Sequence, residues 1–166
     1  MAAQISAPIL IADDDPRDRA LMERILEGAK ITNPLQFVED GDQTIAYLAG
    51  MGRYSNRTLY PLPALLLLDL KMPTVDGFEV LRWLQSRPAS FAVVVLSALS
   101  DLKDIRQAYA LGAHSFLVKP LTVEEMTNLV EGLKGLTARP NSQGSSIEYH
   151  PPEPLFNPGY SKSFLP

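Results

Sequence analysis

Acidic side chains stand immediately after two apolar runs of the sequence. Asp13, Asp14 and Asp15 follow one short run, and Asp69 follows four consecutive leucines at 65–68. Three carboxylates within a few ångströms of one another repel by roughly 1 kcal/mol per pair in water and by about 4 kcal/mol at an intermediate dielectric constant. Such a cluster favours a bound cation. Oxygen ligands without a nearby His or Cys suit a hard ion, Mg²⁺ or Mn²⁺.

Two further polar residues stand in the same kind of position. Ser97 follows the apolar run 91–96, and Lys119 follows the run 114–118. A divalent ion in the acidic cluster would attract phosphate oxygens, Lys119 would supply a second positive charge, and Ser97 would donate a hydrogen bond. Asp69 would then be the nucleophile that forms an aspartyl phosphate.

Each of these residues also has an ordinary structural interpretation. Asp13 and Asp15 can cap a helix, Asp69 can cap the loop after its strand, Ser97 can be a loop residue and Lys119 a surface charge. Each role explains its own residue. Together they require a coincidence at the ends of four strands, so we favour the chemical interpretation.

Alternating strands and amphipathic helices position these side chains. The four leucines leave no polar face, so their strand must be buried on both sides, as in a parallel sheet covered by helices. Five strand–helix alternations predict an α/β fold with right-handed crossovers. We expect the strands near 8–12, 35–39, 65–69, 91–96 and 114–118. The carboxyl ends of parallel strands lie along one edge, where the charged side chains converge.

Local signals mark helix starts and turns. The pair Asp15-Pro16 fits the N-cap and first position of a helix, and Thr122–Glu125 is a capping box. Asp76-Gly77 turns the chain into the helix after the central strand. We interpret the segment 50–63 as a solvated connection.

Composition bounds the class of protein. The 166 residues carry a formal net charge of −4, which argues against nucleic acid as a partner, and no basic cluster opposes this. Without cysteine there is no disulfide and no thiolate site. No signal peptide or membrane-spanning run is visible, so a cytoplasmic protein is expected.

At this point the chain resembles the receiver domains of two-component response regulators, from about Pro8 to Leu136. Four motifs in order carry the resemblance: Ile11-Ala12-Asp13-Asp14-Asp15, Leu68-Asp69-Leu70-Lys71-Met72-Pro73 with Asp76-Gly77, Leu96-Ser97-Ala98, and Phe116-Leu117-Val118-Lys119-Pro120. The resemblance implies a flavodoxin-like (βα)5 three-layer sandwich with sheet order 2-1-3-4-5.

The resemblance also implies residue roles. Asp13, Asp14, Asp69 and the Lys71 backbone carbonyl would hold Mg²⁺. Asp69 would accept the phosphoryl group from a phosphohistidine of a sensor histidine kinase.

Ser97 and Lys119 would hold the phosphate, and Ser97 and Phe116 would form the switch. Phe116 stands where many receivers have Tyr, so a switch through a phenol hydroxyl is unavailable, whereas an inward swing of the aromatic ring is still available. Ser97 replaces the commoner Thr and should serve equally as a hydrogen-bond donor. The Lys119–Pro120 peptide is expected to be cis.

The segment before the central strand, with Tyr47-Leu48 and Arg53-Tyr54, is similar to single-domain regulators partnered with bacterial phytochrome kinases. A stand-alone receiver of this kind would catalyse only its own phosphorylation and dephosphorylation and would signal through altered protein contacts.

Two alternatives remain open. An aspartate-nucleophile phosphatase or phosphotransferase would follow the pattern Asp-x-Asp, but Lys71 stands two residues after Asp69. An interaction module that has lost phosphorylation chemistry would have no need of Asp13, Asp14, Asp69 and Lys119, all of which are present.

The last thirty residues form a separate prediction. We divide the chain into a receiver domain at 1–136 and a Pro- and Ser-rich extension at 137–166, in which Asn141–Ser146 is interpreted as a flexible linker. The extension also contains apolar anchors: Ile147, Tyr149, Leu155, Phe156, Tyr160, Phe164 and Leu165. We therefore expect an extended arm that docks on its own domain or on a second subunit of a homodimer. The face of the fourth helix, fifth strand and fifth helix is the other candidate dimer surface.

Overall fold

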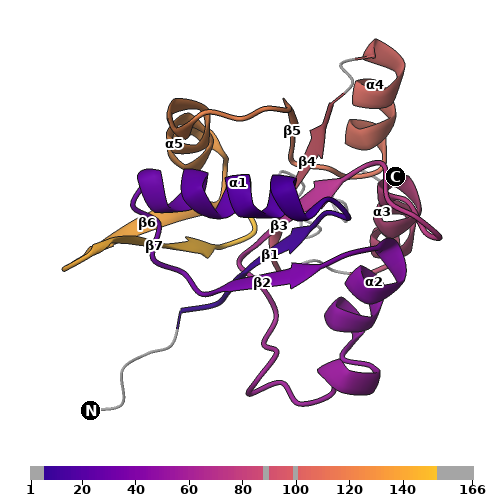
Figure 1. Cartoon of the computed structure of the whole chain (residues 1–166), viewed down its shortest axis with the longest axis horizontal. Helices are drawn as coiled ribbons and strands as arrows, with labels where there is room; N and C mark the ends of the chain where they lie inside the picture. The colour runs from indigo at the N-terminus through magenta and orange to yellow at the C-terminus, as the bar shows by residue number, and fades with distance from the viewer. Residues whose placement is uncertain (1–5, 88–89, 99–100, 153–166) are drawn as a thin grey trace, which may run out of the picture.

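The centre of the molecule is a five-stranded parallel sheet, seen in a computed structural model that describes residues 6–87, 90–98 and 101–152 (Figure 1). The strand order is β2-β1-β3-β4-β5. The strands are β1 (Ile9–Ala12), β2 (Leu35–Val38), β3 (Leu65–Asp69), β4 (Ala92–Ser97) and β5 (Ser115–Val118). The predicted flavodoxin-like fold and its strand order are confirmed.

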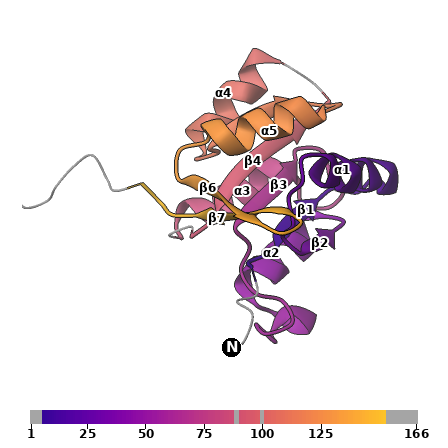
Figure 2. The same ribbon diagram turned by 90° about the vertical axis from the view of Figure 1, so that its left-hand side faces the viewer.

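Helices cover both faces of the sheet (Figures 1 and 2). One face carries α1 (Pro16–Gly28) and α5 (Val123–Gly132), and the other carries α2 (Gly41–Ala49), α3 (Gly77–Gln85) and α4 (Leu102–Ala110). Side chains alternate between the two faces along a strand, so Leu65 and Leu67 pack toward α1 and α5, and Leu66 and Leu68 pack toward α2 and α3. All four leucines of β3 are fully buried, as the uninterrupted apolar run predicts.

Caps start the helices beside the sheet edge. The Asp15 carboxylate accepts a hydrogen bond from the Arg17 backbone N–H at 2.8 Å, and Pro16 is the first residue of α1. The capping box at Thr122–Glu125 begins α5, as predicted. The Lys119–Pro120 peptide is cis, which confirms that prediction.

The glycine at the start of α3 permits a close approach to the central strand. A Cβ atom on Gly77 would lie 2.5 Å from the backbone oxygen of Asp69. The Gly77 N–H donates to the Leu70 oxygen at 2.9 Å. Only a residue without a side chain fits there, so Gly77 fixes the turn that carries Asp69.

The connection at 50–63 is largely exposed, as predicted, but part of it is packed against the domain and not solvated. The segment contains a 3₁₀ turn, η1 (Gly52–Tyr54), and the Tyr54 side chain is buried in contact with the rings of Tyr47 and Tyr60. The Arg57 guanidinium donates to the backbone oxygens of Tyr47 and Leu48, both at 2.7 Å, and so caps the end of α2. Scattered aromatic and basic residues gave no periodic signal for this packing.

The prediction of a flexible linker at Asn141–Ser146 is wrong. The antiparallel strands β6 (Leu136–Asn141) and β7 (Gly144–Tyr149) form a hairpin that packs beside α1 and α5 (Figure 2). Ser145 is tied to the end of α1 through its N–H to the Lys30 oxygen and its own oxygen to the Thr32 N–H, both 2.8 Å. Ile147 is completely buried in the core of its own domain.

The remaining anchors of the predicted arm, Leu155, Phe156, Tyr160, Phe164 and Leu165, lie outside the described residues. The hairpin itself begins at Leu136, the boundary residue of the predicted receiver. The part of the predicted arm that the structure describes therefore docks on the same chain as an antiparallel hairpin, and not as a single extended strand.

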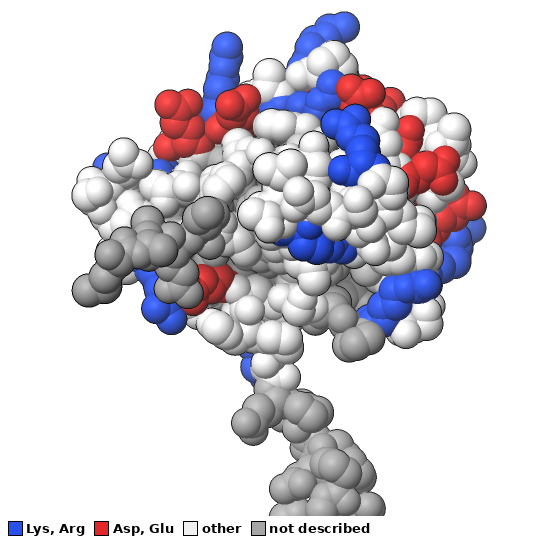
Figure 3. All heavy atoms as spheres, turned by 90° about the horizontal axis from the view of Figure 1, so that it is seen from below, with Lys and Arg blue, Asp and Glu red and all other residues white. Residues whose placement is uncertain are grey.

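The outer surface mixes charges of both signs. On the face seen from below, acidic and basic side chains alternate around a mostly uncharged centre (Figure 3). Of the helices in the described ranges, none combines the length and apolar character needed to cross a lipid bilayer.

Candidate functional site at the carboxyl edge of the sheet

The sheet brings the predicted site residues to one edge. Asp13 follows β1, Asp69 is the last residue of β3, Ser97 is the last residue of β4, and Lys119 follows β5. The register keeps their strand ends level, because Asp69 pairs with Leu96 and Ser97 pairs with Val118. Residues far apart in the sequence therefore meet where the parallel strands end.

Three carboxylates form the acidic part of the site. One oxygen from each of Asp13, Asp14 and Asp69 lies within 4.8 Å of the others. Asp13 and Asp69 are buried, whereas Asp14 is exposed. This all-oxygen set with one open side fits a hard divalent ion that keeps some of its waters.

Lys119 is the cationic counterpart of the acidic cluster. Its Nζ lies 2.6 Å from Asp13 Oδ2, 2.9 Å from Asp18 Oδ2 and 3.4 Å from Asp69 Oδ2. Burial would lower the pKa of Lys119, but hydrogen bonds to Asp13 and Asp18 and the charge of Asp69 raise it above its usual value. The side chain is therefore a positive charge held against the acids.

The Asp69 carboxyl is the group whose protonation the site perturbs. Burial raises the pKa of Asp69 to about 6, and the Asp13 charge acts in the same direction. Lys119 and the Lys71 N–H, which donates to Asp69 Oδ1 at 3.4 Å, oppose this rise. Neutral pH lies above this pKa, so the Asp69 carboxyl is ionised in most molecules and can act as a nucleophile.

The remaining predicted residues surround this centre. Ser97 is buried at the end of β4 and lines an open cleft together with Asp14 and Lys71. Phe116 on β5 is half-buried against the core on the α2–α4 side, and its N–H donates to the Tyr109 hydroxyl at 3.2 Å. The structure thus brings Asp13, Asp14, Asp69, Ser97 and Lys119 together. Phe116 lies outside this group, on β5 and three residues before Lys119.

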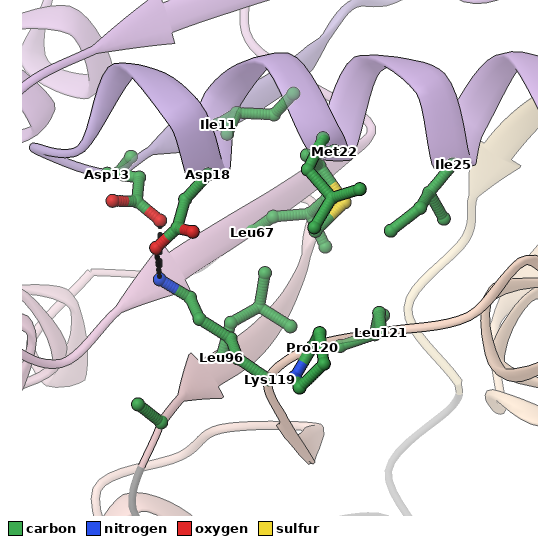
Figure 4. Close-up of a pocket in the computed structure, with 13 residues that line it drawn as sticks. Ile11, Asp13, Asp18, Met22, Ile25, Leu67, Leu96, Lys119, Pro120 and Leu121 are labelled. Carbon is green, nitrogen blue, oxygen red and sulfur yellow. Dashed lines mark hydrogen bonds and ion pairs between the residues drawn. The ribbon is translucent and has the colours of Figure 1, made fainter.

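Asp18 is a contact of the site that the sequence analysis missed. It lies in the first turn of α1 and points toward the Lys119 ammonium beside Asp13 (Figure 4). These groups form the polar end of a cavity of about 240 Å³ whose other walls include Met22, Ile25 and Leu121. The sequence did contain a signal for Asp18. A helix that begins at Pro16, directly after the first strand, has its first turn beside the carboxyl edge of the sheet, and Asp18 lies in that turn.

Comparison with known proteins agrees with this geometry. The model of the response regulator receiver domain family matches residues 9–131. The probable methanogenesis regulatory protein FilR2 of Methanothrix harundinacea is 34% identical, with 76% of this chain and 80% of that protein covered. Response regulator Rcp1 of Synechocystis is 31% identical, with 76% of this chain and 85% of Rcp1 covered.

Solved structures of similar proteins include regulators linked to phytochromes. The bacteriophytochrome response regulator RtBRR has a TM-score of 0.74 at 34% identity, covering 83% of this chain and 84% of that one. The Mn²⁺-bound form of Rcp1 has a TM-score of 0.68 at 29% identity, covering 79% and 97%. The family model spans most of the chain, and the sheet edge carries the acidic cluster and the lysine, so this protein belongs to the response regulator receiver domain family of two-component signalling.

Proposed function

We propose that this receiver accepts a phosphoryl group on Asp69 from the phosphohistidine of a sensor histidine kinase, in a reaction that depends on Mg²⁺. The observation that carries the proposal is the convergence of three carboxylates and Lys119 at one sheet edge, with Lys119 Nζ in contact with both Asp13 and Asp69. Each carboxylate alone has a structural explanation, but their shared cation-binding geometry beside a lysine suits a phosphoryl group.

In the proposed reaction an Asp69 oxygen forms a bond to phosphorus while the P–N bond of the phosphohistidine breaks, and its electron pair returns to the imidazole. Asp13, Asp14, Asp69 and the Lys71 backbone carbonyl would hold Mg²⁺. The ion neutralises charge on the phosphoryl oxygens when it is bound.

Lys119 and Ser97 would bind the phosphoryl oxygens after transfer. Lys119 already lies 3.4 Å from Asp69 Oδ2, close to where such an oxygen would arrive. Ser97 and Phe116 would then transmit the change toward α4 and β5, where Phe116 contacts Tyr109. The output in this proposal is an altered protein contact, and the only chemistry catalysed is the protein's own phosphorylation and dephosphorylation.

A phytochrome-type histidine kinase is the proposed partner. The similarity to the bacteriophytochrome response regulator RtBRR supports this choice. The manganese-bound Rcp1 structure supports a divalent ion in the acidic site, and we propose Mg²⁺ here. The proposed assembly is a cytoplasmic homodimer with no nucleic-acid partner.

Labelling with acetyl phosphate tests the proposal without a kinase. Wild-type protein with Mg²⁺ is expected to gain one phosphoryl group, seen by intact mass, and to lose this ability when EDTA removes the metal. Asp69→Asn should abolish uptake, whereas Asp14→Ala should require more Mg²⁺ and react more slowly with the fold intact. Unchanged labelling of Asp69→Asn would overturn the assignment of the phosphoryl acceptor.

A further inference from the structure

One carboxylate in contact with Lys119 lies outside the acidic cluster that would hold a metal. Asp18 Oδ2 is 2.9 Å from Lys119 Nζ, and the Asp18 side chain is 39% exposed. The cluster itself consists of Asp13, Asp14 and Asp69. Asp18 comes from α1, so it reaches the ammonium from the helix side of the site (Figure 4).

The three contacts of Lys119 are unequal. The Asp13 and Asp18 oxygens lie 2.6 and 2.9 Å from Nζ, whereas the Asp69 oxygen lies 3.4 Å away. An ammonium group has three N–H donors, and the two short contacts occupy two of them. One donor is left for the Asp69 side, so a phosphoryl group on Asp69 would share the ammonium with two carboxylates that bind it at shorter distances.

The two carboxylates that make the short contacts differ in whether they belong to the acidic cluster: Asp13 does, and Asp18 does not. A metal ion at the acidic cluster would share the charge of Asp13 and so weaken its pairing with Lys119. Asp18 has no part in that cluster and keeps its full charge for Lys119. It is therefore the carboxylate that still competes for the ammonium when a metal is present.

We propose that Asp18 is a positioning residue that holds the Lys119 ammonium on the α1 side and competes with the phosphoryl group on Asp69 for it. The inference rests on the proposed function, because it concerns the same phosphoryl site. Asp18 thereby lowers the affinity of the site for a phosphoryl-like anion and makes the phosphorylated form of Asp69 less stable.

Beryllofluoride with Mg²⁺, a non-hydrolysable mimic of the phosphoryl group, provides the test. Asp18→Asn should lower the Kd for beryllofluoride by about two- to five-fold, the range expected for release of a partly exposed ion pair. The Kd for Mg²⁺ alone should stay unchanged or rise, because one nearby negative charge is lost. A merely structural role of Asp18 would weaken both ligands together.

Two variants serve as controls. Asp18→Glu retains the carboxylate and should restore most of the wild-type beryllofluoride affinity. Asp104→Asn removes a negative charge from the cleft shared with Asp14 and Ser97. Among the described residues, Lys119 forms its ion pairs with Asp13, Asp18 and Asp69, and Asp104 is not one of them.

The outcomes separate the inference from the function on which it rests. A smaller effect of Asp104→Asn than of Asp18→Asn supports direct competition for Lys119. Equal effects of the two variants, or an Asp18→Asn Kd that is unchanged or higher than wild type, overturn the role of Asp18 while the phosphoryl site stands. Failure of wild-type protein to bind beryllofluoride with Mg²⁺ overturns the proposed function and this inference with it.

Discussion

Asn33 and Ile147 exchange a pair of hydrogen bonds although 114 positions separate them in the sequence. The Ile147 N–H donates to Asn33 Oδ1 at 2.7 Å, and Asn33 Nδ2 donates to the Ile147 oxygen at 2.9 Å. Asn33 Nδ2 also donates to the Ala7 oxygen at 2.8 Å. One buried amide thus joins the start of the sheet to strand β7 of the hairpin.

We predict that Asn33→Ala lowers the free energy of unfolding by about 2–4 kcal/mol, because it leaves buried backbone groups of Ile147 without partners. Urea denaturation of the whole chain measures the loss. Asn141→Ala is the matched control, because its side chain bonds Thr32 Oγ1 in an exposed position. The control should cost less than about 1 kcal/mol. Equal losses in the two variants would contradict a special role of Asn33.

We predict that His114 makes the docking of the hairpin sensitive to pH. Its Nδ1 accepts a hydrogen bond from the Val93 N–H at 2.9 Å, so the neutral ring carries its proton on Nε2 and donates it to the Tyr149 hydroxyl at 3.0 Å. Burial lowers the pKa of His114 below its usual value of 6.5. The unfolded chain therefore binds the proton more tightly, and the contribution of His114 to stability is lost as pH falls below about 6.5.

We predict that His114→Asn, which keeps an acceptor near the Val93 N–H, flattens the decline in stability between about pH 7 and pH 5. The quantity to compare is the difference between the wild-type and variant free energies of unfolding across that range. Asp69, whose pKa is raised to about 6, has the opposite dependence, because its stability contribution falls as pH rises. It is common to both proteins and cancels in the difference. A difference that does not vary with pH would refute the role of His114.

Gly77→Ala should disturb the site and the fold together. The added methyl group would meet the Asp69 backbone oxygen, which cannot rotate away as a side chain does. We expect a loss of about 1–3 kcal/mol in unfolding free energy and slower phosphoryl uptake from acetyl phosphate. At Gly132, on α5, a Cβ atom would meet none of the described residues within 4 Å apart from its chain neighbours and the backbone of its own helix. Gly132→Ala should therefore be neutral or stabilising by up to about 1 kcal/mol, with normal uptake.

Arg57→Met should loosen the segment 50–63 without affecting the acidic site. The change removes hydrogen bonds to the backbone oxygens of Tyr47, Leu48 and Tyr60 while retaining an apolar stem. We expect faster amide hydrogen exchange in this segment and a loss of about 1–3 kcal/mol. Arg53→Met removes a cation–π contact, in which the guanidinium carbon lies 5.2 Å from the centroid of the Tyr54 ring, and should have a smaller effect. Equal exchange in the two variants would show that Arg57 does not hold the loop.

The sheet and the edge that carries the acidic cluster followed from local sequence patterns. A strand of four consecutive leucines must be covered on both faces if all four are to be buried, and Asp69 comes directly after them. The same argument placed Asp13, Ser97 and Lys119 at strand ends. Parallel strands then bring these ends together, so their proximity required only the fold class and no knowledge of side-chain contacts.

Tertiary structure alone decided the contacts between segments that carry no periodic signal. The segment Asn141–Ser146 has the composition of a linker, yet bonds from Ser145 to Lys30 and Thr32 hold it as a hairpin turn. Its hydrogen-bonding groups are backbone atoms, which every residue has, so side-chain types could not reveal their partners. Asp18 likewise is an ordinary acid on a helix until α1 and the loop after β5 place it 2.9 Å from Lys119. Such pairings depend on where distant elements pack, and this is set by the whole core and not by neighbouring residues.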